Sequence, residues 1–524
     1  MAQTDTYAQI IFSVEGIQAT LLATGKLGDM ICGRDLTTTA LTKAITFCQN
    51  DLRLSEATQP GKANDWFIIL QQDATILRLL VPSKDLGKQV VNHVSLWVLE
   101  NCPQLPILGA CRDFAWTAAD LSTGYAQARS ILNELRVTKN TPFRSVWPFS
   151  RVLMSTGAAT IDTTTNTKAD IAENVSLQKI TQDVHEALIK QKYITSSTDL
   201  AWCNDLNVLL NKSRAKKSAL LHIDINDCGK LYGKISQGKK SANPTDLNKE
   251  FRGLDAALKD ALDKAFVKAL LHILPKNSAE SKGKYVLPIC PIMFNNTDLT
   301  VLILADVALN FVDHFAASFE AITKEQGHPT SIGAGVVMMP RSYPFSRACK
   351  LVEDLTSNAK RFTAQEKSGV RQSSVDYLIL TNDIDSDIDA MRDKSYTSRD
   401  GCLLTAKPFI CGKPWQITPA GKAYVPDQAL SYVLADAELL HNILPTGQLR
   451  EAIDLCRTGR AQAKRAWGKL RDNLMRGLGT SKDSLASFDR IFPKEFFFER
   501  NKVILTLLGD YLELRHLFAR QEEN

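Results

Sequence analysis

The sequence predicts an α+β protein in which two units with the same order of elements are followed by a helical region. In each unit, apolar runs of strand length and longer amphipathic stretches follow one another as β-α-β-β-α-β. That order occurs twice, although the residues of the two units are hardly similar, and beyond Asp385 helical periodicity dominates. An antiparallel sheet with helices packed on it, the ferredoxin-like arrangement, is the simplest fold for such an order.

The first unit is placed at residues 1–158. Its strands are expected at 8–14, 66–70, 75–81 and 105–111, and its helices up to about residue 50 and at 84–100. Residues 159–214 are predicted to connect the two units. They contain a Thr- and Asn-rich stretch at 160–174, typical of a linker, and a helix at 176–190.

The second unit is placed at residues 215–385. Its elements are a strand at 218–225, a helix at 245–274, a hairpin at 287–305, a helix at 307–324, a strand at 331–339 and a helix at 344–362. A polar insertion at 233–246 is predicted to be an exposed loop. Residues 386–524 are predicted to form a helical domain, with amphipathic segments around 427–442, 447–478 and 494–520.

Composition indicates an ordinary globular protein. Hydrophobic residues make up 44% and charged residues 23%, and 63 basic against 57 acidic residues give a net charge of +6. That excess is compatible with a nucleic-acid partner but does not establish one. The N-terminus lacks the features of a signal peptide and no run has the length to span a membrane, so a cytoplasmic location is expected. Eleven single cysteines without a Cys-x-x-Cys pair argue against a zinc ribbon.

Two acidic strand ends are predicted to lie close together in the second unit. Asp224 ends the strand ALLHID, and Asp298 lies at the tip of the following hairpin. Divalent ions such as Mg²⁺ prefer hard oxygen ligands, so Asp224, the carbonyl of Ile225 and Asp298 are candidate ligands. Asp224 is equally interpreted as a residue that caps the following turn. Asp227 is a further candidate ligand, and the dipeptide Asn226-Asp227 fits turn chemistry equally well.

The hairpin tip itself reads Asn295-Asn296-Thr297-Asp298. The hydroxyl of Thr297 cannot neutralise a divalent ion, so catalysis by two metal ions would lose an anionic ligand and most of its rate. Asparagine tolerates the left-handed backbone conformation that tight turns require, but the side chains of Asn295 and Asn296 would crowd a nucleotide lying against the backbone.

Other candidates have an ordinary structural explanation of equal or greater weight. Lys360, near the end of the helix at 344–362, could contact a triphosphate, or could interact with the helix dipole. The basic segment from Cys456 to Gly477, with Trp467 inside it, could contact a phosphate backbone, or could be a solvated helix face with the tryptophan packed inward. His222 lies within a buried strand run, which favours a core histidine over a ligand.

Several motifs of this chain resemble the large palm-polymerase subunit of type III CRISPR effector complexes, in which the ferredoxin-like unit is called a palm. LHIDINDCGKLYG resembles that family's His-x-Asp-Gly-Asn-x-x-Gly strand end, with Ile225 in place of the first glycine. PICPIMFNNTDLTVLILADVALNFV resembles its Gly-Gly-Asp-Asp hairpin, and SIGAGVVMMPRSYPFSRACKLVEDLTSNAK its Ser-x-Gly strand, Tyr-Pro turn and Ala-Lys helix. EGIQATLLATGKLGDMICGRDL, LMSTGAAT, LLTAKPF and LPTGQLREAIDLCRTG extend the resemblance over most of the chain.

The resemblance implies two palms, the second similar to nucleotide-cyclase and GGDEF domains, which in that family converts ATP into cyclic oligoadenylate when the complex senses foreign RNA. It implies Asp224 and Asp298 as catalytic and metal-binding residues, with Mg²⁺ or Mn²⁺, and Ile225, Asn226 and Lys360 as nucleotide contacts. It does not imply Thr297 as a ligand, because the family has a carboxylate there, and no counterpart of the family's N-terminal HD nuclease domain is expected before the first palm.

The expected function is therefore that of an ATP-binding double-palm protein of prokaryotic antiviral defence whose cyclic-oligonucleotide synthase site is weakened or lost. Effector subunits and guide or target RNA are the partners that the resemblance implies, and a stand-alone defence protein would have the same two palms. The alternative is a non-catalytic scaffold or RNA-sensing subunit.

Overall fold

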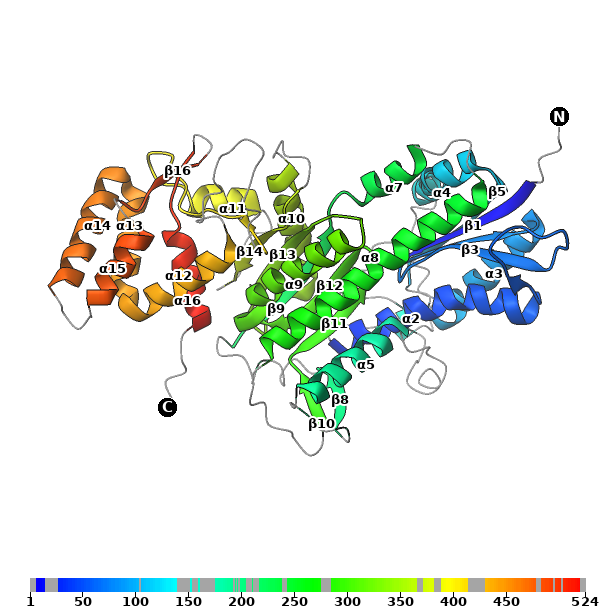
Figure 1. Cartoon of the computed structure of the whole chain (residues 1–524), viewed down its shortest axis with the longest axis horizontal. Helices are drawn as coiled ribbons and strands as arrows, with labels where there is room; N and C mark the ends of the chain where they lie inside the picture. Colours follow the sequence, from blue (N-terminus) through cyan, green and yellow to red (C-terminus); the bar gives the residue numbers. More distant parts are fainter. Residues whose placement is uncertain are drawn as a thin grey trace.

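The computed structural model of the chain confirms the α+β fold. It describes residues 6–14, 27–102, 105–138, 151–152, 159–160, 175–191, 194, 196, 198–203, 210, 216–237, 243–274, 284–364, 371–380, 388–412, 429–476, 482–492, 495–500 and 503–518. In Figure 1 the first palm lies at one end, the second palm in the middle and the C-terminal helices at the other end.

The first palm is a sheet with the strand order β2-β3-β4-β1-β5. Its strands are β1 (Thr6–Val14), β2 (Ser55–Glu56), β3 (Trp66–Gln72), β4 (Ile76–Val81) and β5 (Ile107–Ala115). Strand β1 pairs antiparallel with β4 and β5, and β3 pairs antiparallel with β4, which is the ferredoxin-like order.

Helices cover both faces of this first sheet. They are α2 (Leu27–Thr46), which continues into the short π-helix η1 (Phe47–Asp51), α3 (Lys84–Asn101) and α4 (Ala118–Thr138). Ile10 and Phe12 of β1 pack with α3, whereas Ile11, on the other face, packs with Leu132 of α4. Successive residues of β1 are therefore buried without alternation, because each face has its own helical cover. Helix α4 was not predicted from the sequence.

The second palm repeats the arrangement in a sheet with the order β11-β12-β9-β13-β14-β15. Its strands are β9 (Ser218–Ile225), β11 (Ile289–Phe294), β12 (Asp298–Leu304), β13 (Ile332–Met339), β14 (Ser374–Ile379) and β15 (Phe409–Ile410). The first four have the predicted antiparallel pairing, and β14 runs parallel to β13.

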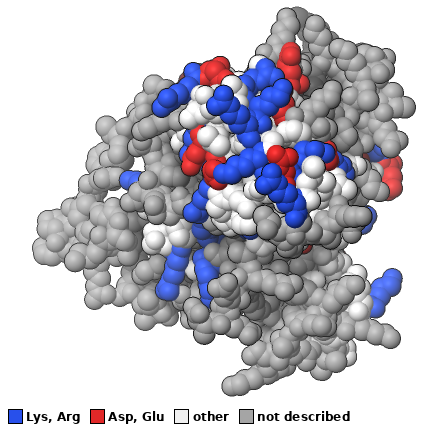
Figure 2. Space-filling model, turned by 90° about the vertical axis from the view of Figure 1, so that its left-hand side faces the viewer, with Lys and Arg blue, Asp and Glu red and all other residues white. Residues whose placement is uncertain are grey.

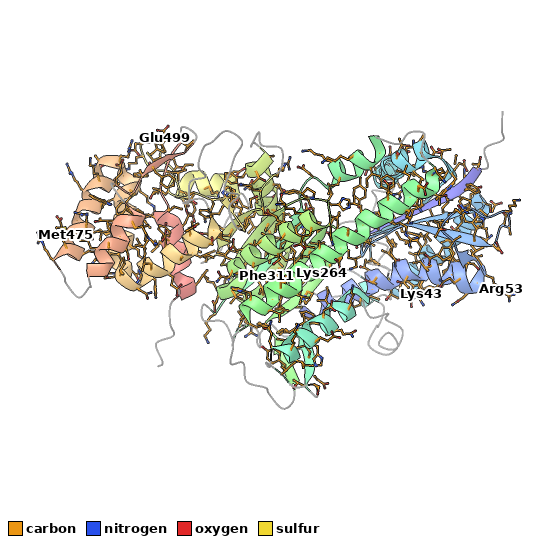
Figure 3. The ribbon with its side chains drawn as sticks, in the orientation of Figure 1. Lys43, Arg53, Lys264, Phe311, Met475 and Glu499 are labelled. Atoms are coloured by element: carbon orange, nitrogen blue, oxygen red, sulfur yellow. The ribbon has the colours of Figure 1, made fainter. Side chains whose placement is uncertain are left out.

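Three helices enclose the second sheet. Helices α8 (Pro244–Ile273) and α9 (Ala305–Glu325) pack on one face, and α10 (Phe345–Ala364) packs on the other. Phe311 of α9, labelled in Figure 3, is fully buried and makes an edge contact with Phe266 of α8, their ring centroids 5.5 Å apart. The helices predicted at 245–274, 307–324 and 344–362 thus agree with the structure within two residues.

Helix α8 also joins the two palms, as its diagonal course in Figure 1 shows. Its N-terminus is capped by Asn243, whose side chain accepts a hydrogen bond from the Thr245 amide at 3.0 Å, and Pro244 occupies the first turn. From there the helix contacts the first palm, because Leu247 packs in one cluster with residues of β3 and β4. The predicted loop at 233–246 is partly wrong, since α7 (Cys228–Gln237) continues through residues 233–237.

The C-terminal region is mainly helical but not entirely so. Its elements are α11 (Ile388–Ser395), α12 (Leu430–Ile443), α13 (Thr446–Thr458), α14 (Arg460–Met475), α15 (Lys482–Ile491), β16 (Phe498–Arg500), β17 (Val503–Leu505) and α16 (Leu508–Phe518). A helix breaks at Gly459, where φ is +135°, a value that only glycine adopts without strain. The helical prediction around 494–520 is wrong for its first half, which forms the hairpin of β16 and β17.

The remaining elements are short or connect the palms. They are α5 (Val175–Lys190), β6 (Arg151–Val152), β7 (Ala159–Thr160), β8 (Asp199–Trp202) and β10 (Lys284–Leu287). Helix α5 agrees with the predicted connector, whereas the predicted linker at 160–174 lies outside the described residues after Thr160. Described cysteines are free thiols and mostly buried. Over the described parts of the chain, no helix combines the length and the apolar character that crossing a membrane requires.

Candidate functional site

The register of the second sheet places the two candidate aspartates opposite each other. Strands β9 and β12 pair antiparallel, with Asp224 facing Asp298 across the ladder. The Ile225 amide donates to the carbonyl oxygen of Thr297 at 2.9 Å, which continues the pairing to the hairpin tip. Two carboxylates at directly opposed positions repel each other unless a cation or a proton compensates them.

The cation beside Asp224 is Lys360. Its Nζ atom lies 2.5 Å from Oδ2 of Asp224 and donates a second hydrogen bond, 3.2 Å long, to the carbonyl oxygen of Ile225. The ammonium group therefore contacts both groups that the sequence suggested as metal ligands on this strand, the Asp224 carboxylate through Oδ2 and the Ile225 carbonyl.

Gly333 makes this position of Lys360 possible. It lies opposite Asp224 on strand β13, and a Cβ atom at this position would lie 2.3 Å from Cγ of Lys360. The lysine side chain thus crosses the sheet over a residue without a side chain. Sequence reasoning did not assign a role to Gly333, although it belongs to the Ser-x-Gly strand motif.

We expect Gly333→Ala to displace Lys360 from Asp224, because the new methyl group and the middle of the lysine chain cannot occupy the same space. The variant should cost about 1–3 kcal/mol of unfolding free energy, as overpacking usually does. Urea denaturation measures this effect. The control is Gly253→Ala in helix α8, where the space beside the glycine is open and alanine should be neutral or stabilising. Equal stability of the Gly333 variant and the wild type would contradict the prediction.

The hairpin tip is held by hydrogen bonds of its own. The Asn295 amide donates to the carbonyl oxygen of Asp298 at 2.9 Å, and its side-chain Nδ2 donates to Oδ1 of Asp298 at 2.5 Å. Burial raises the pKa of the Asp298 carboxyl, and the nearby Asp224 raises it further. His222, the side-chain amide of Asn295 and Lys360 lower the same pKa. Asn295 thus binds Asp298, and it stands where the Gly-Gly-Asp-Asp hairpin described above has its first glycine.

The tip also contacts the first palm. Nδ2 of Asn296 donates to the carbonyl oxygen of Gln72 at 3.0 Å, at the turn between β3 and β4. The next residue of that turn, Asp73, accepts hydrogen bonds from the backbone amides of Ala74 and Asn296. The equivalent hairpins of the two palms therefore meet tip to tip, a contact that the sequence did not predict.

Asp73 titrates near neutrality. Burial, together with the carboxylates of Asp298 and Asp255, raises its pKa to about 7, although the two backbone amides lower it. The folded protein thus retains a proton that the unfolded chain releases near pH 4, so stability falls as the pH rises from about 4 to about 7. We expect Asp73→Asn to remove this loss and to stabilise the protein above pH 7 by up to about 4 kcal/mol.

Urea denaturation at pH 5 and pH 8 tests this prediction, because the variant should differ from the wild type mainly at pH 8. Asp65→Asn, an exposed aspartate of the same palm, provides the control. The prediction fails if both variants show the same pH dependence as the wild type.

The other candidates on the β9 turn have structural partners. Asn226 is 1% exposed, and its Nδ2 donates to Oγ of Ser331 at 2.9 Å, which ties the end of β9 to the start of β13. Asp227 has a φ of +55° and forms ion pairs with Arg371 at 3.1 Å and Lys230 at 3.2 Å. This geometry favours turn chemistry for both residues over direct contact with a metal ion.

The donor set does not fit a pair of divalent ions. Of the predicted ligands, Asp224 and the Ile225 carbonyl bind Lys360, Asp298 binds Asn295, and Thr297 offers no charge. Within the described ranges, no three His, Cys, Asp or Glu side chains are grouped so that they could hold a metal ion. What the site offers instead is an ammonium group at the end of a sheet, suited to a phosphate oxygen.

The two remaining candidates are structural. Nδ1 of His222 lies 2.9 Å from Oγ1 of Thr300, and the residue is buried, as expected for a core histidine. Trp467 packs inward, and its Nε1 donates to the carbonyl oxygen of Phe492 at 3.0 Å.

Figure 2 shows basic and acidic side chains interleaved on the end of the molecule formed by the C-terminal helices. Three cations of α14 are paired with carboxylates, in the ion pairs Arg460–Glu495, Lys469–Glu451 and Arg471–Asp489. This favours a solvated helix face over a phosphate-binding surface.

Comparison with known proteins identifies the fold. No protein-family model matches the sequence, and no curated protein is similar to it. The crystal structure of a Csm1-Csm4 cassette in complex with pppApApA superposes with a TM-score of 0.53 at 11% identity, covering 99% of this chain and 70% of that chain.

Two further structures superpose with a TM-score of 0.42. Csm1 from T. onnurineus is 12% identical and is covered to 52%, and the Csm1-Csm4 subcomplex of the type III-A CRISPR-Csm interference complex is 11% identical and covered to 54%. In each case 70% of this chain is matched, and the chain spans about half the length of these structures. The fold of this chain is therefore similar to that in the Csm1-Csm4 cassette, in agreement with the fold that the sequence motifs imply.

Proposed function

We propose that this chain is a nucleotide-binding double-palm protein of a type III CRISPR-like antiviral system whose cyclic-oligonucleotide synthase site is weakened or lost. The observation that carries the proposal is the position of Lys360, whose ammonium group lies at the strand end between Asp224 and the Ile225 carbonyl. A triphosphate oxygen can replace the carboxylate as its partner. The similar Csm1-Csm4 structures hold pppApApA or an ATP analogue, which makes ATP the nucleotide to test.

Loss of turnover follows from the same contacts. Asp224 is neutralised by Lys360, Asp298 is bonded to Asn295, and Thr297 adds no charge, so two metal ions would lack the anionic ligands that stabilise them. Asn296 further occupies the region between the palm tips by bonding to Gln72. With Mg²⁺ or Mn²⁺, the protein should therefore bind ATP without efficient phosphodiester formation.

Calorimetric titration with ATP tests the binding. Lys360→Ala should weaken ATP binding about tenfold or more, because it removes a hydrogen-bonded charge. The control is Arg361→Ala, the next residue on α10, an exposed cation that bonds to Asn358. Equal affinity of wild type and Lys360→Ala, or absence of ATP binding in the wild type, would refute the proposal.

A second assay tests turnover. Labelled ATP is incubated with Mg²⁺ or Mn²⁺, and product is compared with that of the Asp224→Ala/Asp298→Ala variant. Product made only by the wild type would show that the site is still catalytic.

A non-catalytic scaffold or RNA-sensing subunit is the second candidate function. The observation that favours it is the tip-to-tip contact of Asn296 and Gln72, which gives the degenerate hairpin a structural role between the palms. In this case effector subunits and guide or target RNA would be the partners. Copurification of the intact chain with a small RNA or with neighbouring subunits, without any ATP affinity, would support this candidate.

A further inference from the structure

Three cations lie at the end of strand β9, and each of them is paired with an aspartate. Lys360 is paired with Asp224, as described above. Oδ2 of Asp227 lies 3.1 Å from Nε of Arg371 and 3.2 Å from Nζ of Lys230. We call Lys230, Lys360 and Arg371 the cation group. Sequence reasoning assigned no role to Lys230 or Arg371.

The register of the second sheet places the cation group at one end of the sheet. One residue from each of β9, β13 and β14 forms a row across it, namely Asp224, Gly333 and Ser374. Oγ of Ser374 donates to the carbonyl oxygen of Ala359 at 2.8 Å, which fixes the end of α10 beside this row. Lys360 follows Ala359 on α10, and Arg371 precedes Ser374 by three residues. Both cations therefore reach the end of β9 from the same side of the chain fold.

The charges at this strand end are balanced, whereas a site for two metal ions is strongly acidic. The cation group faces three carboxyl groups, those of Asp224, Asp227 and Asp298. Even with all three ionised, the strand end has no excess of negative charge. Two divalent ions bring four positive charges, which carboxylates and substrate phosphates together must compensate. The surplus of carboxylates that would attract such ions is missing here.

The cation group is accessible to a ligand from solvent. The side chains of Lys360 and Arg371 are each 26% exposed, and that of Lys230 is 69% exposed. A guanidinium group has five N–H donors and an ammonium group has three, so each cation can turn from its aspartate toward a phosphate oxygen. The carboxylates of Asp224 and Asp227 are themselves partly exposed and can then be hydrated.

We propose that the second palm binds its nucleotide without divalent cations, with Lys230, Lys360 and Arg371 supplying the positive charge that metal ions supply in a two-metal site. This inference rests on the proposed function and specifies its ligand as the metal-free polyphosphate of a nucleotide. Free ATP carries more negative charge than its complex with Mg²⁺, so the cation group attracts the free form more strongly.

Calorimetric titration of the full chain with ATP tests the proposal in two buffers of equal ionic strength, one with excess EDTA and one with excess Mg²⁺. The Kd for ATP should be no higher in EDTA than in Mg²⁺. In EDTA, Arg371→Met should raise the Kd about tenfold, because it removes a charged hydrogen-bond donor. The control is Arg347→Met, which removes an exposed arginine at the other end of α10 and should leave the Kd unchanged.

A second variant covers the case in which Arg371→Met does not fold. Asp227→Asn removes the carboxylate that holds Arg371 and Lys230, and asparagine tolerates the φ of +55° at this position. In EDTA this variant should bind ATP about threefold more tightly, the size of effect expected for a partly exposed ion pair. If Asp227 were a metal ligand, the same substitution would weaken ATP binding in Mg²⁺. Asp354→Asn, an exposed aspartate of α10, provides the control for loss of a negative charge.

The outcomes separate this inference from the proposed function. If EDTA weakens ATP binding by the wild type about tenfold or more, or if Asp227→Asn weakens it in Mg²⁺, the inference is overturned and nucleotide binding itself stands. If Arg371→Met and Arg347→Met bind ATP equally well, the assignment of the cation group is wrong. If ATP binds in neither buffer, the proposed function fails, and the inference fails with it.

Discussion

Replacing Thr297 by aspartate should strengthen the binding of Mn²⁺ about 10- to 100-fold. The new carboxylate would stand next to Asp298 and opposite the end of β9, where it would supply the one anionic position that the hairpin tip lacks. Hard divalent cations gain most of their affinity from anionic oxygen ligands, and Mn²⁺ binds carboxylates as Mg²⁺ does. Calorimetric titration with Mn²⁺ alone measures the effect without requiring any turnover.

The matched control is Thr297→Asn, which has nearly the same shape as the aspartate variant and no charge. It should bind Mn²⁺ no more tightly than the wild type. Adding Asp224→Ala to Thr297→Asp should cancel the gain, because the ion needs a ligand on both strands. If Thr297→Asp and Thr297→Asn bind Mn²⁺ equally, the missing carboxylate is not what limits this site.

Local sequence patterns predict some features of this site, whereas the features that depend on tertiary packing cannot be predicted from them. Strand periodicity and the order of elements place Asp224 and Asp298 at neighbouring strand ends, and the register confirms that juxtaposition. The pairing of Lys360 with Asp224 joins residues 136 positions apart. It depends on the crossing of α10 over Gly333, which no periodicity reveals.

The contact between the palm tips is unpredictable for the same reason. The repeated element order implies that both palms have an equivalent hairpin, but it does not reveal the packing between the palms that brings Asn296 to Gln72. Helix α4 was missed because few large apolar residues mark its inner face, among them Leu121 and Leu132.

A buried charge network joins the second palm to the C-terminal helices. Asp376 of β14 is 0% exposed and forms two hydrogen bonds with Arg392 of α11, at 2.8 and 2.6 Å. Close by, Lys407 donates to Glu513 of α16 at 2.6 Å. Burial lowers the pKa of Lys407 to about 8, an effect that the carboxylate of Asp510 opposes, and burial raises the pKa of Glu513 to about 8, an effect that Arg392 opposes.

Arg392→Met should therefore destabilise the protein by about 3–5 kcal/mol, because it leaves the carboxylate of Asp376 buried without its partner. Urea denaturation at pH 7 measures the loss. Arg457→Met, which breaks the exposed ion pair with Asp454, should cost less than about 1 kcal/mol and serves as the control for removal of an arginine.

The double variant Asp376→Leu/Arg392→Met shows whether Arg392→Met loses stability because a carboxylate is left unpaired or because the packing of the arginine side chain is lost. If the unpaired carboxylate is responsible, removing it as well should recover most of the lost stability, since a buried ion pair and an apolar pair of similar volume are often close in free energy. If the double variant is as unstable as Arg392→Met, the arginine acts by packing. The network would then hold the C-terminal helices to the palm through its shape rather than through its charges.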